Sequence, residues 1–169
     1  MTDGYLVDTS ALSARYDPGH PKHAAVKAFL DGLSPNDLVF VSAVAIAELR
    51  FGAALWQTAE GHASPKATTV LAEANLHAIR DITRYTGTEY GAIKTRVAFK
   101  YLKEPMNRKY RTPWIKDWVD QNTGRALSIN EGDLWMCAQA RERNLVMLTA
   151  DRKMDRIARA DPLVRLSFI

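Results

Sequence analysis

Short apolar segments that alternate with helix-forming segments most constrain the fold of this chain. Residues 5–8, 38–41 and 145–149 read as buried strands, and each is followed by a segment in which apolar residues have helical spacing. Strands that are apolar on both faces and joined by helices are typical of parallel sheets. We therefore expect an α/β fold with a mainly parallel central sheet flanked by helices.

Capping and chain-breaking residues place the other elements. Thr9 or Ser10 can cap a helix that starts near Ala11 and is broken at Asp17-Pro18-Gly19, and Ser42 can cap the next long helix. The expected helices cover 11–16, 21–30 with Pro21 in the first turn, 43–58, 65–77, Thr86 or Thr88 to 101, a span from 131, and 152–158. Residues 78–82 are expected to be a short strand or loop, and 163–166 an edge strand.

Length and composition predict one soluble domain over residues 1–169. A chain of 169 residues can bury a substantial core without disulfides, and the single cysteine, Cys137, reads as a buried structural thiol. The net charge of +4 and a pI of about 9.3 weakly favour an anionic partner. Without a signal peptide or an apolar run long enough to span a membrane, we expect a cytoplasmic protein with no membrane partner.

Four acidic residues occupy matching positions at the ends of these elements. Asp8 and Asp151 follow the apolar runs 5–7 and 145–149. Asp133 lies in the first turn of the helix from 131, and Glu48 lies in the second turn of the helix from 43. In parallel sheets ligands bind beyond the carboxyl ends of the strands, near the point where the strand order reverses, so these four side chains can share one crevice.

Each acid also has a structural interpretation. Asp133 can form a capping box with Asn130, Asp151 can cap the last helix, and Asp8 can be a turn residue. Glu48 is harder to explain in this way, because its neighbours are almost all apolar. Four carboxylates in one pocket would raise one another's pKa, and a hard cation held by oxygen ligands, Mg²⁺ or Mn²⁺, would relieve the repulsion.

Such a site suits phosphodiester hydrolysis, because a carboxylate-held cation can polarise the phosphate and activate a water. The sequence has no cysteine pair for zinc, no glycine-rich phosphate loop and no Gly-x-Ser-x-Gly nucleophile elbow. We expect the four histidines to lie in loops or at exposed helix ends and not to bind metal.

At these positions the chain resembles the PIN-domain ribonucleases, and most closely the VapC-type toxins of bacterial toxin–antitoxin pairs. The resemblance spans nearly the whole chain and rests on an ordered set of motifs. They are Leu6-Val7-Asp8-Thr9-Ser10, the stretch 41–52 around Glu48, Glu89-Tyr90-Gly91-Ala92-Ile93, Asn130-Glu131-Gly132-Asp133-Leu134-Trp135-Met136, and Leu148-Thr149-Ala150-Asp151.

The resemblance implies a PIN-like, Rossmann-like fold and an Mg²⁺- or Mn²⁺-dependent endoribonuclease. The acidic metal positions fall on Asp8, Glu48, Asp133 and Asp151, with Thr149 and Ser10 orienting a carboxylate or a metal-bound water. It further implies a homodimer, a small antitoxin whose C-terminal segment covers the site, and contact with operator DNA only through that antitoxin.

Residues 102–125 depart from the compact family pattern, because the link between helices is long, basic and aromatic there. One interpretation is an arm that contacts RNA, and the other is a helical hairpin at a dimer or antitoxin interface with an apolar face of Trp114, Ile115, Trp118 and Val119. Both interpretations remain open. The basic residues are Arg108, Lys109, Arg111 and Lys116, interleaved with Tyr110, Trp114 and Trp118.

Two other functions compete with the toxin hypothesis. A housekeeping PIN nuclease that processes RNA would use the same site, although a short chain without an added RNA-binding module fits a toxin better. A non-catalytic interaction protein would use the acids only as helix caps. That reading predicts that Asp8→Asn and Asp133→Asn have little effect, whereas the nuclease reading predicts lost activity.

Overall fold

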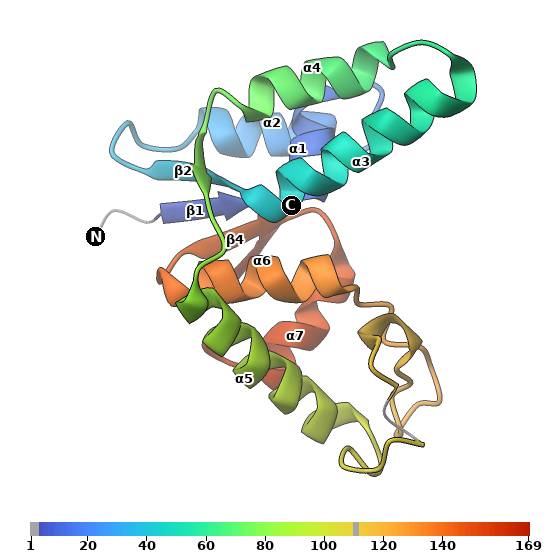
Figure 1. Cartoon of the computed structure of the whole chain (residues 1–169). Helices are drawn as coiled ribbons and strands as arrows, with labels where there is room; N and C mark the ends of the chain where they lie inside the picture. Colours follow the sequence, from blue (N-terminus) through green and yellow to red (C-terminus); the bar gives the residue numbers. More distant parts are fainter. Residues whose placement is uncertain (1–3, 110–111) are drawn as a thin grey trace.

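A five-stranded parallel sheet organises the part of the chain that this computed structural model describes, residues 4–109 and 112–169 (Figure 1). The strand order is β3-β2-β1-β4-β5, and every neighbouring pair is parallel. This confirms the expected α/β fold. The strands are β1 (Gly4–Val7), β2 (Leu38–Ser42), β3 (Ala78–Arg80), β4 (Val146–Thr149) and β5 (Leu166–Phe168).

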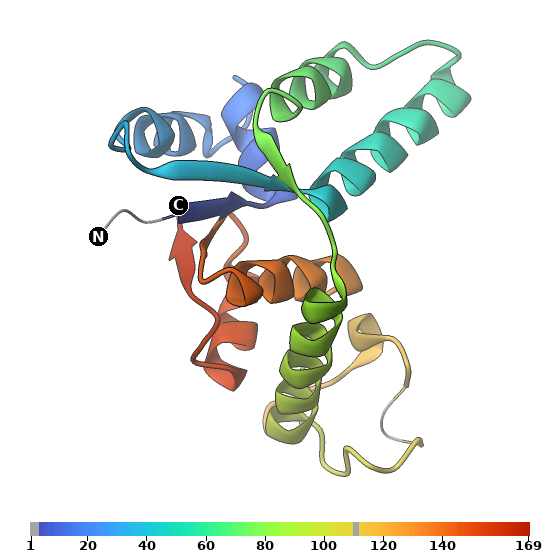
Figure 2. The same cartoon turned by 60° about the vertical axis from the view of Figure 1, so that its left-hand side comes forward.

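Helices cover both faces of the sheet. In Figures 1 and 2, α1, α2 and α4 lie on one side and α5, α6 and α7 on the other, while α3 and α4 form a hairpin that projects beyond the sheet. The helices are α1 (Thr9–Tyr16), α2 (His23–Asp31), α3 (Ala43–Glu60), α4 (Pro65–Ala74), α5 (Arg84–Tyr101), α6 (Glu131–Glu142) and α7 (Asp155–Ala160), with 3₁₀ turns η1 (Ile115–Asp117) and η2 (Arg152–Met154).

The core lies where the central strands meet α6. Leu6 and Val7 on β1 and Leu148 on β4 are fully or almost fully buried, as continuous apolar strands in a covered parallel sheet should be. Cys137 of α6 is buried among them, and burial raises the pKa of its thiol well above the ordinary value. The structural interpretation of this cysteine is therefore confirmed, because a neutral thiol is a poor nucleophile.

Several predicted boundaries were wrong. The cap of α1 is Asp8, not Thr9 or Ser10, because its carboxylate accepts from the backbone N–H of Ala11. The cap of α5 is Thr83, because Thr83 and Thr86 form a reciprocal capping box, so Thr86 lies inside the helix. Helix α2 begins after Pro21, and β5 begins at Leu166, where pairing with β4 sets its register.

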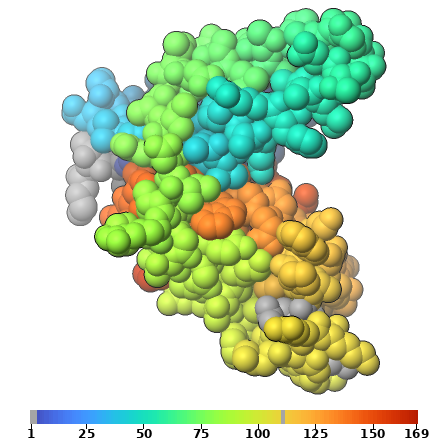
Figure 3. Space-filling view, viewed as in Figure 1, coloured from blue at the N-terminus to red at the C-terminus, as the bar shows by residue number. Residues whose placement is uncertain are grey.

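The helical-hairpin interpretation of residues 102–125 was also wrong. In the described part of this segment only η1 is helical, and a single antiparallel bridge joins Val119 to Ala126. Ile115 and Trp118 are buried within the domain, so that only Trp114 and Val119 of the predicted apolar face are exposed. Figure 3 shows the segment in gold and yellow against α5. Tyr110 and Arg111, which were part of the predicted basic and aromatic pattern, lie outside the described residues.

Within the described ranges, every helix is too short or too polar to cross a bilayer.

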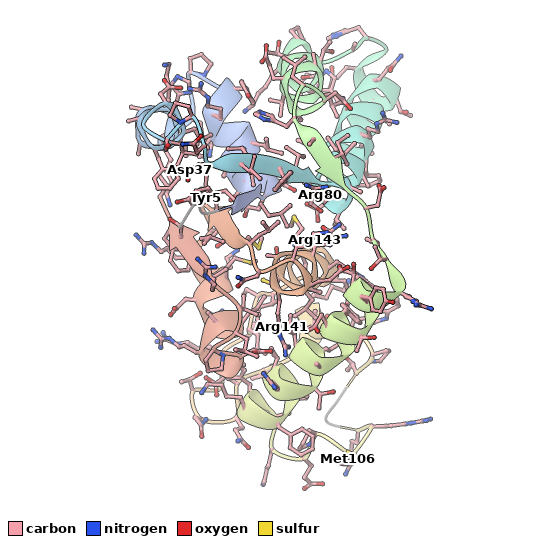
Figure 4. The ribbon with its side chains drawn as sticks, turned by 90° about the vertical axis from the view of Figure 1, so that its left-hand side faces the viewer. Tyr5, Asp37, Arg80, Met106, Arg141 and Arg143 are labelled. Carbon is pink, nitrogen blue, oxygen red and sulfur yellow. The ribbon has the colours of Figure 1, made fainter. Side chains whose placement is uncertain are left out.

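A buried carboxylate ties three helices together below the sheet. Asp161, just after α7, is fully buried and accepts from Arg96 of α5 at 2.6 Å and from Arg141 of α6 at 2.7 Å. Figure 4 shows Arg141 extending from α6 toward α5. Because both guanidinium groups meet one buried acid, the packing of α5, α6 and α7 depends on a complete set of ion pairs.

Replacing Asp161 with alanine should destabilise the fold strongly. The change removes the buried partner of Arg141, whose side chain is only 13% exposed and keeps among the described residues only its ion pair with Glu89, and broken buried pairs cost about 3–5 kcal/mol. Urea denaturation followed by circular dichroism measures the loss. The control is Asp31→Ala, which removes the ion pairs of a solvent-exposed aspartate with Lys27 and Arg15 and should cost only about 1 kcal/mol. Equal losses in the two variants would contradict the assigned role.

Candidate active site

The four predicted acids line one pocket at the carboxyl end of the sheet. The strand order reverses between β1, which continues to β2, and β4, which continues to β5. The loops after these two strands separate there, as parallel sheets do at a ligand-binding crevice. The pocket has a volume of about 230 Å³ and is lined by Asp8, Glu48, Asp133 and Asp151 together with Thr9, Ser10, Ser13, Asn130 and Met136.

Asp8 is the most buried of the four acids, with 4% of its surface exposed. Its carboxylate accepts hydrogen bonds from the Thr149 hydroxyl at 2.6 Å, the Ala11 N–H at 2.7 Å and the Ser10 hydroxyl at 2.8 Å. Burial raises the pKa of Asp8, and these hydrogen bonds oppose the rise. The carboxylate is therefore held in a fixed orientation.

Thr149 and Ser10, the two predicted orienting residues, contact Asp8 and the loop after β4. The Thr149 hydroxyl accepts from the Asp151 N–H at 3.0 Å while it donates to Asp8. The Ser10 hydroxyl accepts from the Ala150 N–H at 3.0 Å. Ser10 lines the pocket, whereas Thr149 is fully buried behind it. Both hydroxyls connect the Asp8 carboxylate to the backbone that carries Asp151.

Glu48 reaches the pocket from the second turn of α3. The Thr9 hydroxyl donates to Glu48 Oε2 at 2.5 Å, a contact that the sequence alone did not suggest. The carboxylate rests on the first turn of α6, where the helix dipole favours an anion. A Cβ atom at Gly132 would overlap Glu48 Oε1, so the absence of a side chain there makes room for the carboxylate. In the sequence, only the position of Gly132 next to Asp133 hinted that this glycine makes room for a carboxylate.

Asp133 has both of the roles that the sequence left open. It forms a capping box with Asn130, accepting from the Asn130 N–H through Oδ2 at 2.8 Å. Burial, and then the nearby charges of Asp151, Glu48 and Asp8, raise its pKa to about 6. A cap at a helix N-terminus should instead favour the charged form. The raised pKa therefore identifies Asp133 as a carboxylate in a crowded, negatively charged pocket.

Asp151 is partly accessible to solvent, with 35% of its side-chain surface exposed. It caps η2 by accepting from the Lys153 N–H at 2.9 Å, and the Lys153 Nζ lies 3.8 Å from its Oδ2. The capping role that the sequence offered for Asp151 is therefore present. Its carboxylate also lines the pocket, so capping and a place in the site are compatible.

The chemistry of this donor set fits a divalent hard cation. All of the candidate ligands are carboxylate oxygens, and the nearby charges of Asp151, Glu48 and Asp8 add to burial in raising the pKa of Asp133. As the side chains stand, no three His, Cys, Asp or Glu residues of the described ranges are arranged to hold one metal ion. Each of the four carboxylates is hydrogen-bonded to a neighbouring hydroxyl or backbone N–H.

The raised pKa of Asp133 predicts that the metal-free protein becomes less stable as the pH rises. The folded state holds this proton more tightly than the unfolded chain, whose aspartate titrates near 3.8, so its stabilising contribution is lost as the pH rises through about 6. Asp133→Asn should therefore raise the melting temperature relative to the parent near neutrality, but not at acidic pH. Thermal melts in EDTA across this range measure the difference.

The control for this experiment is Asp117→Asn, which removes an exposed carboxylate from η1 outside the pocket. It should show no such trend. If Asp133→Asn were destabilising at every pH, capping would be the dominant role of Asp133.

Comparisons with known proteins agree with this geometry. The PIN domain family matches residues 5–160. No curated protein sequence matches the chain significantly. Among solved structures, VapBC2 from Rickettsia felis bound to a promoter DNA fragment is similar with a TM-score of 0.65, 16% identity and 98% coverage of both chains. FitAcB from Neisseria gonorrhoeae is similar with a TM-score of 0.61 and 23% identity, over 98% of this chain and 96% of that one.

A third structure is VapC20 from Mycobacterium tuberculosis, described as a toxin that cleaves the sarcin-ricin loop. Its TM-score is 0.54 at 14% identity, over 89% of this chain and 92% of that one. At these identities the structures show a shared fold. The family match covers most of the chain, including the strands and helices that carry all four pocket acids. The chain therefore belongs to the PIN domain family.

Proposed function

We propose that this protein is an endoribonuclease that depends on Mg²⁺ or Mn²⁺ and is the toxin of a VapBC-type toxin–antitoxin pair. The observation that carries the proposal is the pocket of four carboxylates at the strand-order reversal of a PIN domain. PIN domains are nucleases that generally use a divalent metal. The basic net charge is compatible with an anionic substrate.

Asp8, Glu48, Asp133 and Asp151 are the residues that would hold the cation. When bound, a divalent cation neutralises charge on the phosphate and lowers the pKa of a water molecule. The fixed orientation of Asp8 by Ser10 and Thr149 would limit the reorganisation needed on binding.

The similar structures support a toxin over a housekeeping nuclease. VapBC-5 from Mycobacterium tuberculosis is named as a member of the VapBC family of toxin–antitoxin systems, and VapBC2 from Rickettsia felis as bound to a promoter DNA fragment; each matches this chain over nearly its full length. We infer that the antitoxin of this protein would bring it to operator DNA. An open reading frame for a small protein next to this gene would favour the toxin further.

The surface beside the pocket supports a protein partner. A second cleft of about 180 Å³ between α3 and α4 shares Glu48 and Ser13 with the carboxylate pocket, and its walls include Leu49, Ala53 and Val70. Phe51 and Leu55 on α3 are 70% and 59% exposed. An antitoxin segment laid along this apolar cleft would reach and cover the carboxylates. The exposed face of α3 is also available to a second copy in the proposed homodimer.

Purified protein should cleave total RNA in Mg²⁺ or Mn²⁺, and EDTA should abolish cleavage. Asp8→Asn should reduce the rate at least about 100-fold, because it removes a carboxylate from the buried, fixed ligand position. Gel electrophoresis of the products measures the rate, and 3′-hydroxyl and 5′-phosphate ends are expected.

Asp37→Asn changes a partly exposed aspartate before β2, outside the carboxylate pocket, and should cleave like the parent protein. If the folded parent neither cleaves RNA nor shows a shift in melting temperature with either metal, the non-catalytic interpretation replaces the nuclease.

Gly132→Ala tests whether the position of the Glu48 carboxylate against Gly132 matters, without removing any carboxylate. The added methyl group overlaps Glu48 Oε1 and should push this flexible carboxylate from the first turn of α6, weakening Mn²⁺ binding and cleavage by roughly tenfold or more. The fold should be retained, because alanine is a better helix former than glycine. Calorimetric titration with Mn²⁺ and a thermal melt give the two readouts.

The matched control is Gly91→Ala in α5, where an added Cβ has no heavy atom within 4 Å. Unchanged Mn²⁺ affinity in Gly132→Ala would show that the position of Glu48 is not important for metal binding.

A further inference from the structure

Residues 112–118 are held in one conformation by their own buried side chains. Ile115 is 0% exposed and Trp118 is 2% exposed. The Trp118 indole N–H donates to the Thr112 carbonyl at 2.8 Å, and the Trp118 backbone N–H donates to the Ile115 carbonyl at 3.0 Å. These contacts make the segment a folded part of the domain, in contrast to a loose arm.

The same segment is attached to the helix turn that carries Asp133. Glu131, the first residue of α6, accepts from the Ile115 N–H at 3.3 Å and from Lys94 Nζ at 2.8 Å. Lys94, on α5, also donates to the Pro113 carbonyl at 3.2 Å. The Tyr90 hydroxyl donates to Glu131 at 2.5 Å. Glu131 is therefore an anchor between the segment, α5 and the first turn of α6, two residues before Asp133.

This anchoring leaves one large aromatic side chain in solvent. Trp114 is 58% exposed, although its neighbours Ile115 and Trp118 are buried. Lys116 is also exposed, and Arg108 is exposed on the preceding part of the segment. The described part of residues 102–118 carries four exposed cations, Lys103, Arg108, Lys109 and Lys116, against two exposed acids, Glu104 and Asp117. An exposed tryptophan in a segment with a net positive charge has the composition of a nucleic-acid contact.

We propose that residues 112–118 form one wall of the RNA-binding face, and that Trp114 stacks on an unpaired base next to the cleaved phosphate. This inference rests on the proposed nuclease function and assigns a substrate-contacting role to the segment. Single-stranded RNA is recognised by aromatic stacking on splayed bases combined with cations on the phosphates. The Glu131 anchor fixes the distance between the stacked base and the carboxylates, which would position the strand for cleavage.

The structure favours RNA over a protein partner at Trp114 for two reasons. First, of the four residues predicted to form an apolar interface, Ile115 and Trp118 are buried in the domain itself, so that only Trp114 and Val119 remain exposed. Second, the segment is continuous with the carboxylate pocket through Glu131, Gly132 and Asp133. A separate apolar groove of about 280 Å³ between α5 and Met106 (Figure 4) is lined by Phe99 and Trp118, not by Trp114.

Trp114→Ala should weaken RNA binding about 5- to 150-fold, the range for loss of one base–aromatic stack. The measurement is fluorescence anisotropy with a labelled single-stranded RNA of randomised sequence, in the Asp8→Asn background so that no RNA is cleaved. Trp114→Phe should restore most of the affinity, because a phenyl ring also stacks. Trp56→Ala, which removes a 47% exposed tryptophan from α3, is the matched control and should bind RNA like its parent.

Circular dichroism and size-exclusion chromatography on each variant complete the test. Equal RNA affinity in Trp114→Ala and Trp56→Ala overturns the inference. So does a Trp114→Ala variant that changes oligomeric state while it keeps its RNA affinity, a result that assigns Trp114 to a protein interface. RNA cleavage by wild-type protein separates the two proposals. If the wild-type protein cleaves RNA and Trp114→Ala leaves the RNA affinity unchanged, only the stacking role is rejected. If the wild-type protein neither binds nor cleaves RNA, the nuclease function is rejected as well.

Discussion

The hydrogen bond from the Thr149 hydroxyl to Asp8 joins the ends of β4 and β1 at the point where the sheet reverses its strand order. Both residues are buried, so an unpaired carboxylate there would be costly. Parallel pairing of β1 with β4 brings the two side chains together, and the bond in turn holds the loop that carries Asp151. The geometry of the site therefore depends on a pairing between segments that are far apart in the chain.

Around this bond the structure concentrates negative charge that a stable fold would normally disperse. The raised pKa of Asp133 is the clearest sign, because its capping role alone would favour the charged form. Gly132 increases the crowding, since the absence of a side chain admits Glu48 to the same helix turn. Such an arrangement costs stability and is typical of functional sites, where a bound cation offsets the repulsion.

The segment 102–125 is attached beside the carboxylate pocket, and its described residues contribute no carboxylate to the pocket lining. Its buried side chains and the Glu131 anchor couple it to the first turn of α6, so a shift in one would be transmitted to the other. Glu131 has its oxygens engaged by Tyr90, Lys94 and the Ile115 N–H. It lies beside the pocket in sequence, yet its structural role is to hold the segment against the domain.

Short-range patterns in the sequence determined the class of fold and the identities of the pocket acids. Apolar strands alternating with amphipathic helices require a covered parallel sheet, and residues at the ends of its central strands must meet at one edge. Asp8 and Asp151 could therefore be placed together from sequence, and the motifs around Glu48 and Asp133 supplied the other two.

Only the tertiary structure decided the contacts between distant residues. Three such contacts join segments that are separated by many residues in the chain. They are the hydrogen bond from Thr9 to Glu48, the contact of the Glu48 carboxylate with Gly132, and the hydrogen bond from the Ile115 N–H to Glu131. The helical hairpin, one of the two interpretations of residues 102–125, was wrong because it was inferred from local sequence alone. Ile115 and Trp118 are buried because they pack against the rest of the domain, where Trp118 lies beside α5. No local pattern of residues predicts this packing. Local propensity limits each segment to a few conformations, and packing against the rest of the chain selects one of them.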